Sequence, residues 1–225
     1  MLEDKSGKEL VDDVIKIRKE KVIDFFKNKV NWIVYVFLAF VIFIALKIRT
    51  SNLHGLRDVT TGTWTLGPDL DPFLFLRWAK YIVEHGTLFA NDIMRYVPIG
   101  YETKTDLLLH PYMIAWFHNF LGPIFGVESV THSAVLYPVF FFGLTVIAFF
   151  LFVRKIFVNN LGKTKANIIA VVSSFFLSVL PSLLPRTIAG IPEKESSAFF
   201  FMFMALYLFL CAWQTKERYK TILYG

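Results

Sequence analysis

The chain has 225 residues, of which 55% are hydrophobic and 17% aromatic, and its net charge is +6. A mean hydropathy of +0.51 excludes an ordinary water-soluble domain of this length and favours a membrane protein with several spans. The basic residues gather beside the apolar runs rather than in a stripe, so they indicate membrane topology, and no nucleic acid partner is expected. The single cysteine, Cys211, lies within an apolar run, which excludes an intrachain disulfide and a cysteine-based metal site.

The first two elements are a charged segment and an apolar run. Residues 1–29 mix Lys with Asp and Glu around a few apolar side chains, which predicts a cytoplasmic amphipathic segment that is solvated or lies at the membrane interface. Residues 30–48 are apolar apart from Asn31 and approach the ~20 residues that cross ~30 Å of hydrocarbon. A cleaved signal peptide is the alternative, but no small-residue cleavage site follows, so an uncleaved span is favoured.

Three more spans complete a predicted all-α polytopic membrane protein, at residues 131–153, 166–184 and 197–213. The distribution of Lys and Arg then predicts how these spans are oriented in the membrane. Eight basic residues fall in residues 1–30, four in 154–165 and three in 216–220, whereas the loop 185–196 carries two. The positive-inside rule therefore places both termini in the cytoplasm and the loops 49–130 and 185–196 on the outer face of the cell membrane.

The long outer loop is too long for a bare connector. Two helix-like stretches stand in it, at residues 72–84 and 107–121, separated by a piece rich in Asp, Pro and Gly. We expect both to be helices at the outer interface. His110 and His118 lie in the second stretch without a recognisable metal-ligand spacing, and we interpret them as packed or interfacial side chains.

Two acidic segments face the same compartment in this topology. Asp69-Leu70-Asp71 stands before Pro72, and Glu193-Lys194-Glu195 follows Pro192. Carboxylates near a bilayer are costly without a counter-ion, so acidic groups from two separate loops suggest a shared divalent cation, Mn²⁺ or Mg²⁺. The alternative is that each segment only caps a helix or interacts with its dipole.

These residues also carry a family resemblance. The run Asp71-Pro72-Phe73-Leu74-Phe75-Leu76-Arg77, with Val83-Glu84-His85-Gly86 and Arg95 to Gly100 behind it, resembles the first outer loop of archaeal-type oligosaccharyltransferase catalytic subunits. Arg186-Thr187-x-Ala189-Gly190 followed by Glu193-x-Glu195 resembles their second outer loop. The sequence departs from the family pattern at Glu193, where Asp is usual.

The resemblance implies the N-terminal part of a GT-C transmembrane domain, residues 30–225, with about four spans and interfacial helices. It implies transfer of an oligosaccharide from a polyprenyl (dolichyl) phosphate or pyrophosphate to Asn of Asn-x-Ser/Thr sequons. Asp71, Glu193 and Glu195 would be catalytic residues that hold Mn²⁺ or Mg²⁺, with Asp71 also near the acceptor amide. The implied partners are the lipid-linked donor, the acceptor polypeptide and membrane lipids. The family's catalytic subunits are longer, so this chain is expected to be inactive alone.

Some assignments stay open on the sequence. Arg77 and Arg186 are candidates for phosphate contact, although snorkelling or pairing with nearby carboxylates is the usual behaviour of interfacial Arg. Another GT-C enzyme such as a protein O-mannosyltransferase is an alternative, but that family usually has Asp-Glu where this chain has Asp71-Pro72. A non-catalytic membrane protein or transporter is a further alternative; a transporter places ionisable groups within its spans, and here they stand at the ends.

Overall fold

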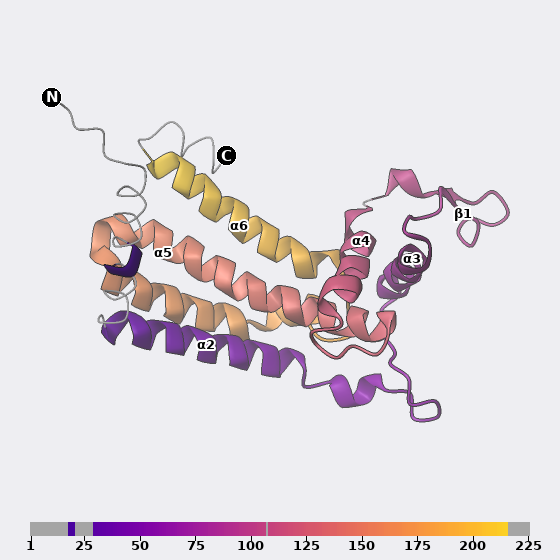
Figure 1. The fold of residues 1–225 in the computed structure, drawn as a ribbon, viewed down its shortest axis with the longest axis horizontal. Helices are drawn as coiled ribbons and strands as arrows, with labels where there is room; N and C mark the ends of the chain where they lie inside the picture. Colours follow the sequence, from indigo (N-terminus) through magenta and orange to yellow (C-terminus); the bar gives the residue numbers. More distant parts are fainter. Residues whose placement is uncertain (1–17, 21–28, 107, 216–225) are drawn as a thin grey trace, which may run out of the picture.

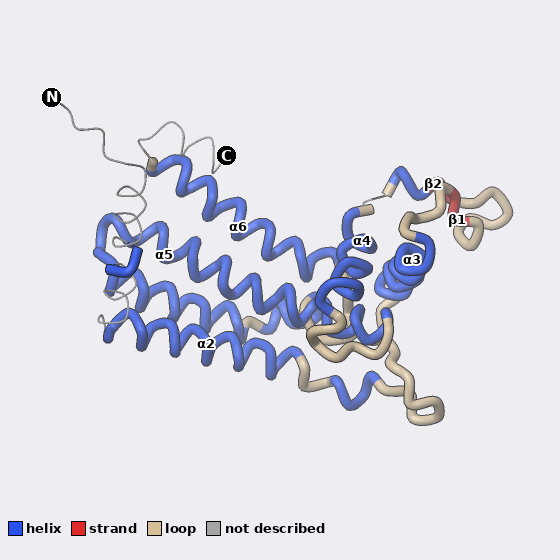
Figure 2. Tube along the Cα trace, viewed as in Figure 1, coloured by secondary structure: helices blue, strands red, loops and turns tan. Residues whose placement is uncertain are grey.

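The structure is a computed structural model that describes residues 18–20, 29–106 and 108–215, and the described chain is predominantly helical (Figures 1 and 2). The predicted amphipathic segment, residues 1–29, lies almost entirely outside the described residues. Among the described residues, β1 (Asn91–Asp92) and β2 (Tyr101–Glu102) pair as a short antiparallel ladder. The predicted all-α polytopic class is confirmed.

Three of the described helices are long and apolar enough to cross a membrane. They are α2 (Lys29–Arg49), α5 (Val130–Val179) and α6 (Lys194–Gln214). α5 spans 50 residues, about 75 Å if it were straight, which is more than twice the hydrocarbon thickness.

α5 folds back on itself at Gly162 and forms a helical hairpin (Figure 1). Gly162 has φ 77° and ψ 168°, a conformation that is essentially restricted to glycine. The two arms touch where Arg154 Nε donates a hydrogen bond to Asn167 Oδ1 at 2.6 Å. The predicted ranges 131–153 and 166–184 fall one in each arm, but the second arm ends at Val179. Pro181 explains the earlier end, because a residue before proline is driven out of the helical conformation.

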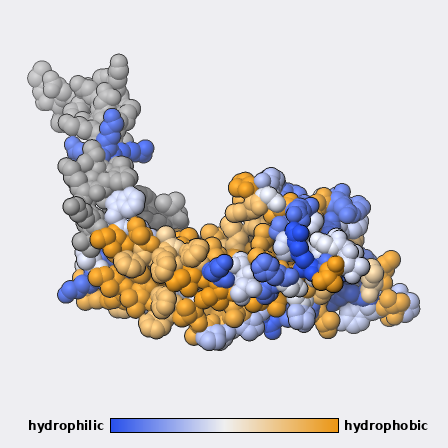
Figure 3. Space-filling model, turned by 90° about the horizontal axis from the view of Figure 1, so that it is seen from below, coloured by the Kyte–Doolittle hydropathy of each residue, from blue (hydrophilic) through white to orange (hydrophobic). Residues whose placement is uncertain are grey.

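α2 has two distinct faces in the bundle. Val34, Leu38, Val41 and Ala45 are buried in one apolar core with the α5 residues Phe142, Val146, Phe150, Val153 and Ala170. Their spacing of three and four residues is that of one helix face. The opposite face exposes large apolar side chains, and an apolar face left bare in this way suits lipid contact. Figure 3 shows apolar surface over the bundle and polar side chains gathered at one end.

That end, which we call the loop end, carries the connections between the long helices (Figure 1). The segment between α2 and α5 contains the 3₁₀ turns η1 (Leu53–Leu56) and η2 (Thr103–Thr105) and the helices α3 (Asp71–His85) and α4 (Leu109–Trp116). α4 continues into a π-helical turn, η3 (Phe117–Leu121). Helices are therefore present at both predicted stretches. The segment between α5 and α6 begins with the 3₁₀ helix η4 (Pro181–Arg186).

The loop end has an apolar core of its own. α3 and α4 pack on the first turns of α5 through a buried cluster of large side chains, among them Phe75, Leu76, Ile114, Phe117 and Tyr137. The Phe117 and Tyr137 rings meet edge to face with centroids 6.1 Å apart. This core fixes α3 against the bundle, and with it the acidic residue at the start of α3.

Candidate functional site

The first acidic segment lies at the start of α3. Asp71 opens the helix with Pro72 in its first turn, a position that proline favours. The N-cap position is held by Leu70, which makes no side-chain cap hydrogen bond. Asp69 Oδ1 accepts a hydrogen bond from the Leu70 N–H at 2.8 Å, and the Asp71 side chain is exposed. The side-chain cap that would have explained this acidic pair by helix formation alone is therefore not formed.

The second acidic segment lies at the start of α6. Glu193 occupies the N-cap position, again without a side-chain cap hydrogen bond, and it is buried, with 3% of its surface exposed. Its backbone carbonyl accepts a hydrogen bond from Ser196 Oγ at 2.6 Å. This bond fixes the backbone of the turn, and the Glu193 carboxylate takes no part in capping the helix. Glu195 lies in the first turn of α6 and is exposed.

The structure brings the two segments together. The Gly67 N–H donates a backbone hydrogen bond to the Gly190 carbonyl at 2.8 Å, which joins the chain just before Asp69 to the chain just before Glu193. Arg186 Nη1 lies 3.4 Å from Asp69 Oδ2 and 3.0 Å from Glu193 Oε1. The pairing with carboxylates expected for Arg186 is thus present, and it spans both loops.

Four carboxylates lie close enough for the other three to influence Glu193 electrostatically: Asp69, Asp71, Glu193 and Glu195, which we call the acidic cluster. Burial raises the pKa of Glu193, Glu195 raises it further, Arg186 lowers it, and Asp69 and Asp71 add smaller upward effects. The resulting pKa of Glu193 is about 7. The pKa of Glu193 is therefore raised first by burial and then by neighbouring negative charge, and Arg186 does not fully offset the two.

The acidic cluster suits a hard divalent cation by its donor chemistry, because carboxylate oxygens are the ligands that Mg²⁺ and Mn²⁺ prefer. In the described part of the chain, however, no three His, Cys, Asp or Glu side chains are already arranged around one point where a metal ion would be held. The guanidinium of Arg186 stands between Asp69 and Glu193 instead. A positive charge is therefore already placed between the two loops.

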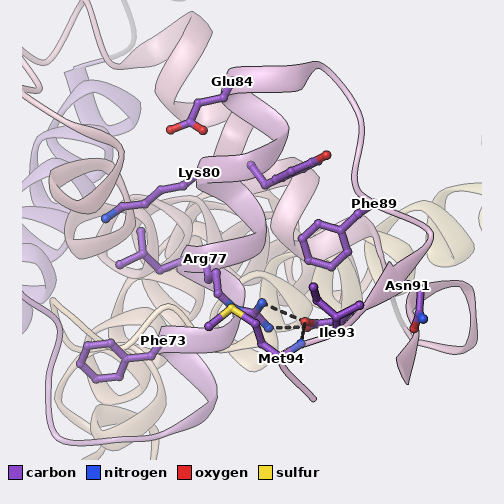
Figure 4. Close-up of a pocket in the computed structure, with 11 residues that line it drawn as sticks. Phe73, Arg77, Lys80, Glu84, Phe89, Asn91, Ile93 and Met94 are labelled. Atoms are coloured by element: carbon purple, nitrogen blue, oxygen red, sulfur yellow. Dashed lines mark hydrogen bonds and ion pairs between the residues drawn. The ribbon is translucent and has the colours of Figure 1, made fainter. Parts of the chain in front are cut away.

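Arg77 belongs to a different part of the loop end. Its guanidinium makes a paired contact with the carboxylate of Asp92, with Nη1 2.9 Å from Oδ1 (Figure 4). Trp78 Nε1 also donates to Asp92, at 3.0 Å. Burial alone would raise the pKa of Asp92, but the hydrogen bonds from Arg77 and Trp78 hold it below its ordinary value. Arg77 thus pairs with a carboxylate outside the acidic cluster.

The Arg77–Asp92 pair lies at a pocket of about 560 Å³. One wall is the outward face of α3, including Phe73, Lys80 and Glu84, and the other is the chain around β1, including Phe89 and Met94 (Figure 4). None of the four carboxylates of the acidic cluster lines it.

His110 is a packed side chain, as the sequence predicted, but its contact with the second loop was not predicted. Its ring is buried, with Nε2 2.8 Å from the Pro192 carbonyl. Burial lowers the pKa of His110 to about 4, so the ring is neutral at pH 7 and Nε2–H donates to that carbonyl. The Phe75 ring of α3 packs edge to face on it, with centroids 4.7 Å apart. His110 thereby links α3 and α4 to the residue before Glu193.

The fold and the site together define a class: a polytopic helical membrane protein with an acidic cluster at one end of its spans. Residues 34–224 match the family model described as Oligosaccharyl transferase STT3, N-terminal. The chain therefore belongs to the oligosaccharyl transferase STT3 family, whose members are glycosyltransferases of protein N-glycosylation. A search of curated proteins found no match.

Proposed function

We propose that this chain carries part of the catalytic centre of an oligosaccharyltransferase. The reaction is transfer of an oligosaccharide from a polyprenyl (dolichyl) phosphate or pyrophosphate to the side-chain amide of Asn in Asn-x-Ser/Thr. The observation that carries the proposal is the junction of the two acidic loops, through the Gly67–Gly190 hydrogen bond and the Arg186 bridge. Membership of the family supplies the reaction class.

The reaction requires charge neutralisation at two points. The amide nitrogen of Asn is a poor nucleophile because its lone pair is delocalised, and the lipid phosphate is a poor leaving group while it carries its full charge. In the proposed site, Asp71, Glu193 and Glu195 would hold Mn²⁺ or Mg²⁺, and the bound ion would supply Lewis-acid stabilisation of the phosphate. The donor chemistry supports this assignment, because the two loops supply carboxylate oxygens, which are the ligands that Mg²⁺ and Mn²⁺ prefer.

The protein side chains have distinct tasks in this proposal. Asp71 is exposed at the first turn of α3 and accepts hydrogen bonds from the acceptor amide, which orients its nitrogen. Arg186 is half-exposed between the loops, with 47% of its side chain accessible, and offers its remaining N–H donors to phosphate. The same role for Arg77 has less support, because its guanidinium is already paired with the buried Asp92.

We further propose that the loop end faces outward from the cell membrane, with the N-terminus in the cytoplasm. The concentration of Lys and Arg near the other ends of the spans supports this orientation. A lipid-linked donor is consistent with it, since the lipid carries the sugar to a compartment where nucleotide sugars are not made.

The test is transfer to an Asn-x-Thr peptide by the full-length enzyme that contains this chain. Asp71→Ala is expected to lower the rate about 100-fold or more, because it removes a ligand and an amide partner together. Chelation of divalent cations should abolish wild-type transfer and Mn²⁺ should restore it. The matched control is Glu84→Gln, which removes a carboxylate of the same helix about 20 Å along its axis and should leave transfer unchanged. Near-normal transfer by Asp71→Ala would refute the assignment.

A further inference from the structure

Arg49, the last residue of α2, is a fully buried cation. Its Nε donates to Thr187 Oγ1 at 2.9 Å, and its Nη1 donates to the Ser178 carbonyl at 2.9 Å. The guanidinium carbon lies 3.2 Å from the centre of the Phe142 ring. Within the described residues no carboxylate forms a salt bridge with Arg49, and its Nη2 has no hydrogen-bond partner.

The same residue is bonded to the second loop through its backbone. The Ala189 N–H donates to the Arg49 carbonyl at 2.9 Å, and three residues further on Asn52 Nδ2 donates to the Ala189 carbonyl at 2.8 Å. The Gly190 N–H donates to the Val135 carbonyl at 3.0 Å. The segment 187–190 is therefore held at Thr187, Ala189 and Gly190, by the end of α2, by Asn52 just after it and by the first turns of α5.

Stability alone does not account for a buried arginine of this kind. A buried charge without a counter-ion is costly, and replacing buried charged groups by apolar side chains of similar volume is often neutral or stabilising. The segment that Arg49 holds begins directly after Arg186 and ends at Gly190, which is bonded to Gly67. Both ends of that segment thus lead to the acidic cluster.

We propose that Arg49 is a positioning residue, which fixes the segment 186–193 so that Arg186 and Glu193 meet the first acidic loop. The effect of Arg49 on catalysis rests on the proposed function. Its effect on the distance between the two loops can be tested separately. Arg49 touches neither the acidic cluster nor the pocket beside α3, so it acts only through the loop that it holds.

The geometric test measures the distance between the loops by pulsed electron resonance. Spin labels are placed at Leu70→Cys and Ser182→Cys, both exposed positions, in a full-length protein in which Cys211 and every other cysteine have been replaced. We expect one narrow distance distribution with Arg49, a distribution at least about twofold broader with Arg49→Met, and an intermediate width with Arg49→Lys, which keeps the charge and one donor. If the Met protein does not fold, the Lys protein carries the test.

The control is Val41→Ala, a buried position on α2 two turns before Arg49. It should lower the unfolding temperature but leave the distribution narrow. Unchanged width in both Arg49 variants would overturn the inference, as would a fall in unfolding temperature that matches Val41→Ala without broadening.

The catalytic test uses the same variants. In Arg49→Met, the Mn²⁺ concentration for half-maximal transfer should rise about tenfold, as when a residue that orients a metal ligand is lost, while kcat at saturating Mn²⁺ changes far less. An unchanged Mn²⁺ requirement together with a broadened distribution would overturn the link from Arg49 to the site. Broadening in an enzyme whose transfer needs no metal would overturn the proposed metal site and leave the positioning role intact.

Discussion

At the scale of single residues, Glu193 is a side chain whose protonation depends strongly on its surroundings. It is buried near three other carboxylates, and its ion-pair partner within the described residues, Arg186, also contacts Asp69. Its pKa of about 7, against an ordinary value of 4.5, means that the folded protein binds a proton there more tightly than the unfolded chain does. Folding stability must therefore depend on pH in this range.

The direction of that dependence follows from the raised pKa. Between pH 4.5 and 7 the folded state holds more protons than the unfolded state, so the contribution of Glu193 is present below pH 4.5 and is lost as the pH rises through 7. We predict that the metal-free protein loses up to about 3 kcal/mol across this window relative to Glu193→Gln, which cannot titrate. Unfolding midpoints of both proteins in detergent at pH 4.5, 6 and 8 measure the difference. Parallel midpoints would show that Glu193 has an ordinary pKa.

The residues of the site differ in how far sequence could predict them. Asp71, Glu193 and Glu195 are recognisable because acidic side chains are rare in an apolar chain, and the structure brings their loops together. Arg49 and His110 give no such signal. Their partners, Thr187 and Pro192, lie 138 and 82 positions away, and no periodicity or spacing encodes a contact between residues so distant. An arginine at the end of a span is also what an ordinary snorkelling residue looks like.

At the scale of elements, hydropathy and proline largely determine the long helices. Apolar runs of sufficient length predicted helices at 30–48 and 197–213, and the structure has α2 and α6 there. The hairpin within α5 was harder to delimit, because its helical arms continue past the apolar runs to a turn at Gly162. The close approach of two loop backbones, Gly67 to Gly190, depends on glycines that sequence alone does not distinguish from ordinary turn residues.

Gly190, at the junction of the two loops, is a position that should tolerate substitution poorly. It has φ +84°, and an added Cβ would lie 2.6 Å from Leu56 Cδ1 and 3.2 Å from the Gly67 nitrogen. We predict that Gly190→Ala costs about 2 kcal/mol or more of stability, from backbone strain and the clash together, and lowers transfer by displacing Glu193. Chemical denaturation and the peptide transfer assay measure the two effects.

Gly62 provides the matched control for that prediction. It also has a positive φ, +69°, but no atom lies within 4 Å of an added Cβ. Gly62→Ala therefore introduces backbone strain alone, about 1 kcal/mol, and should leave transfer intact. Equal losses of stability in Gly190→Ala and Gly62→Ala would mean that the close contact between the loops adds nothing to the backbone strain of replacing a glycine.

At the scale of the whole molecule, the acidic cluster and the basic bend of α5 lie at opposite ends of the bundle. The acidic cluster lies at the loop end, whereas the bend of α5 at the opposite end carries Lys163 and Lys165 close to Arg154 and Lys155 in sequence (Figure 1). Because every long helix runs between these two ends, the positive-inside rule orients them all together. The three-dimensional arrangement thus leaves two possible topologies, with the loop end either outside the cell or in the cytoplasm.

That choice is tested by labelling single cysteines in intact cells with a maleimide that does not cross membranes. In a Cys211→Ala background, Leu70→Cys at the loop end should be labelled at once, because this position is 86% exposed and is predicted to face outward. Lys163→Cys, exposed at the bend of α5, should react only after the membrane is permeabilised. The reverse pattern would place the acidic cluster in the cytoplasm, where a lipid-linked donor and an exported acceptor would not meet it, and would remove the physical basis for the proposed orientation.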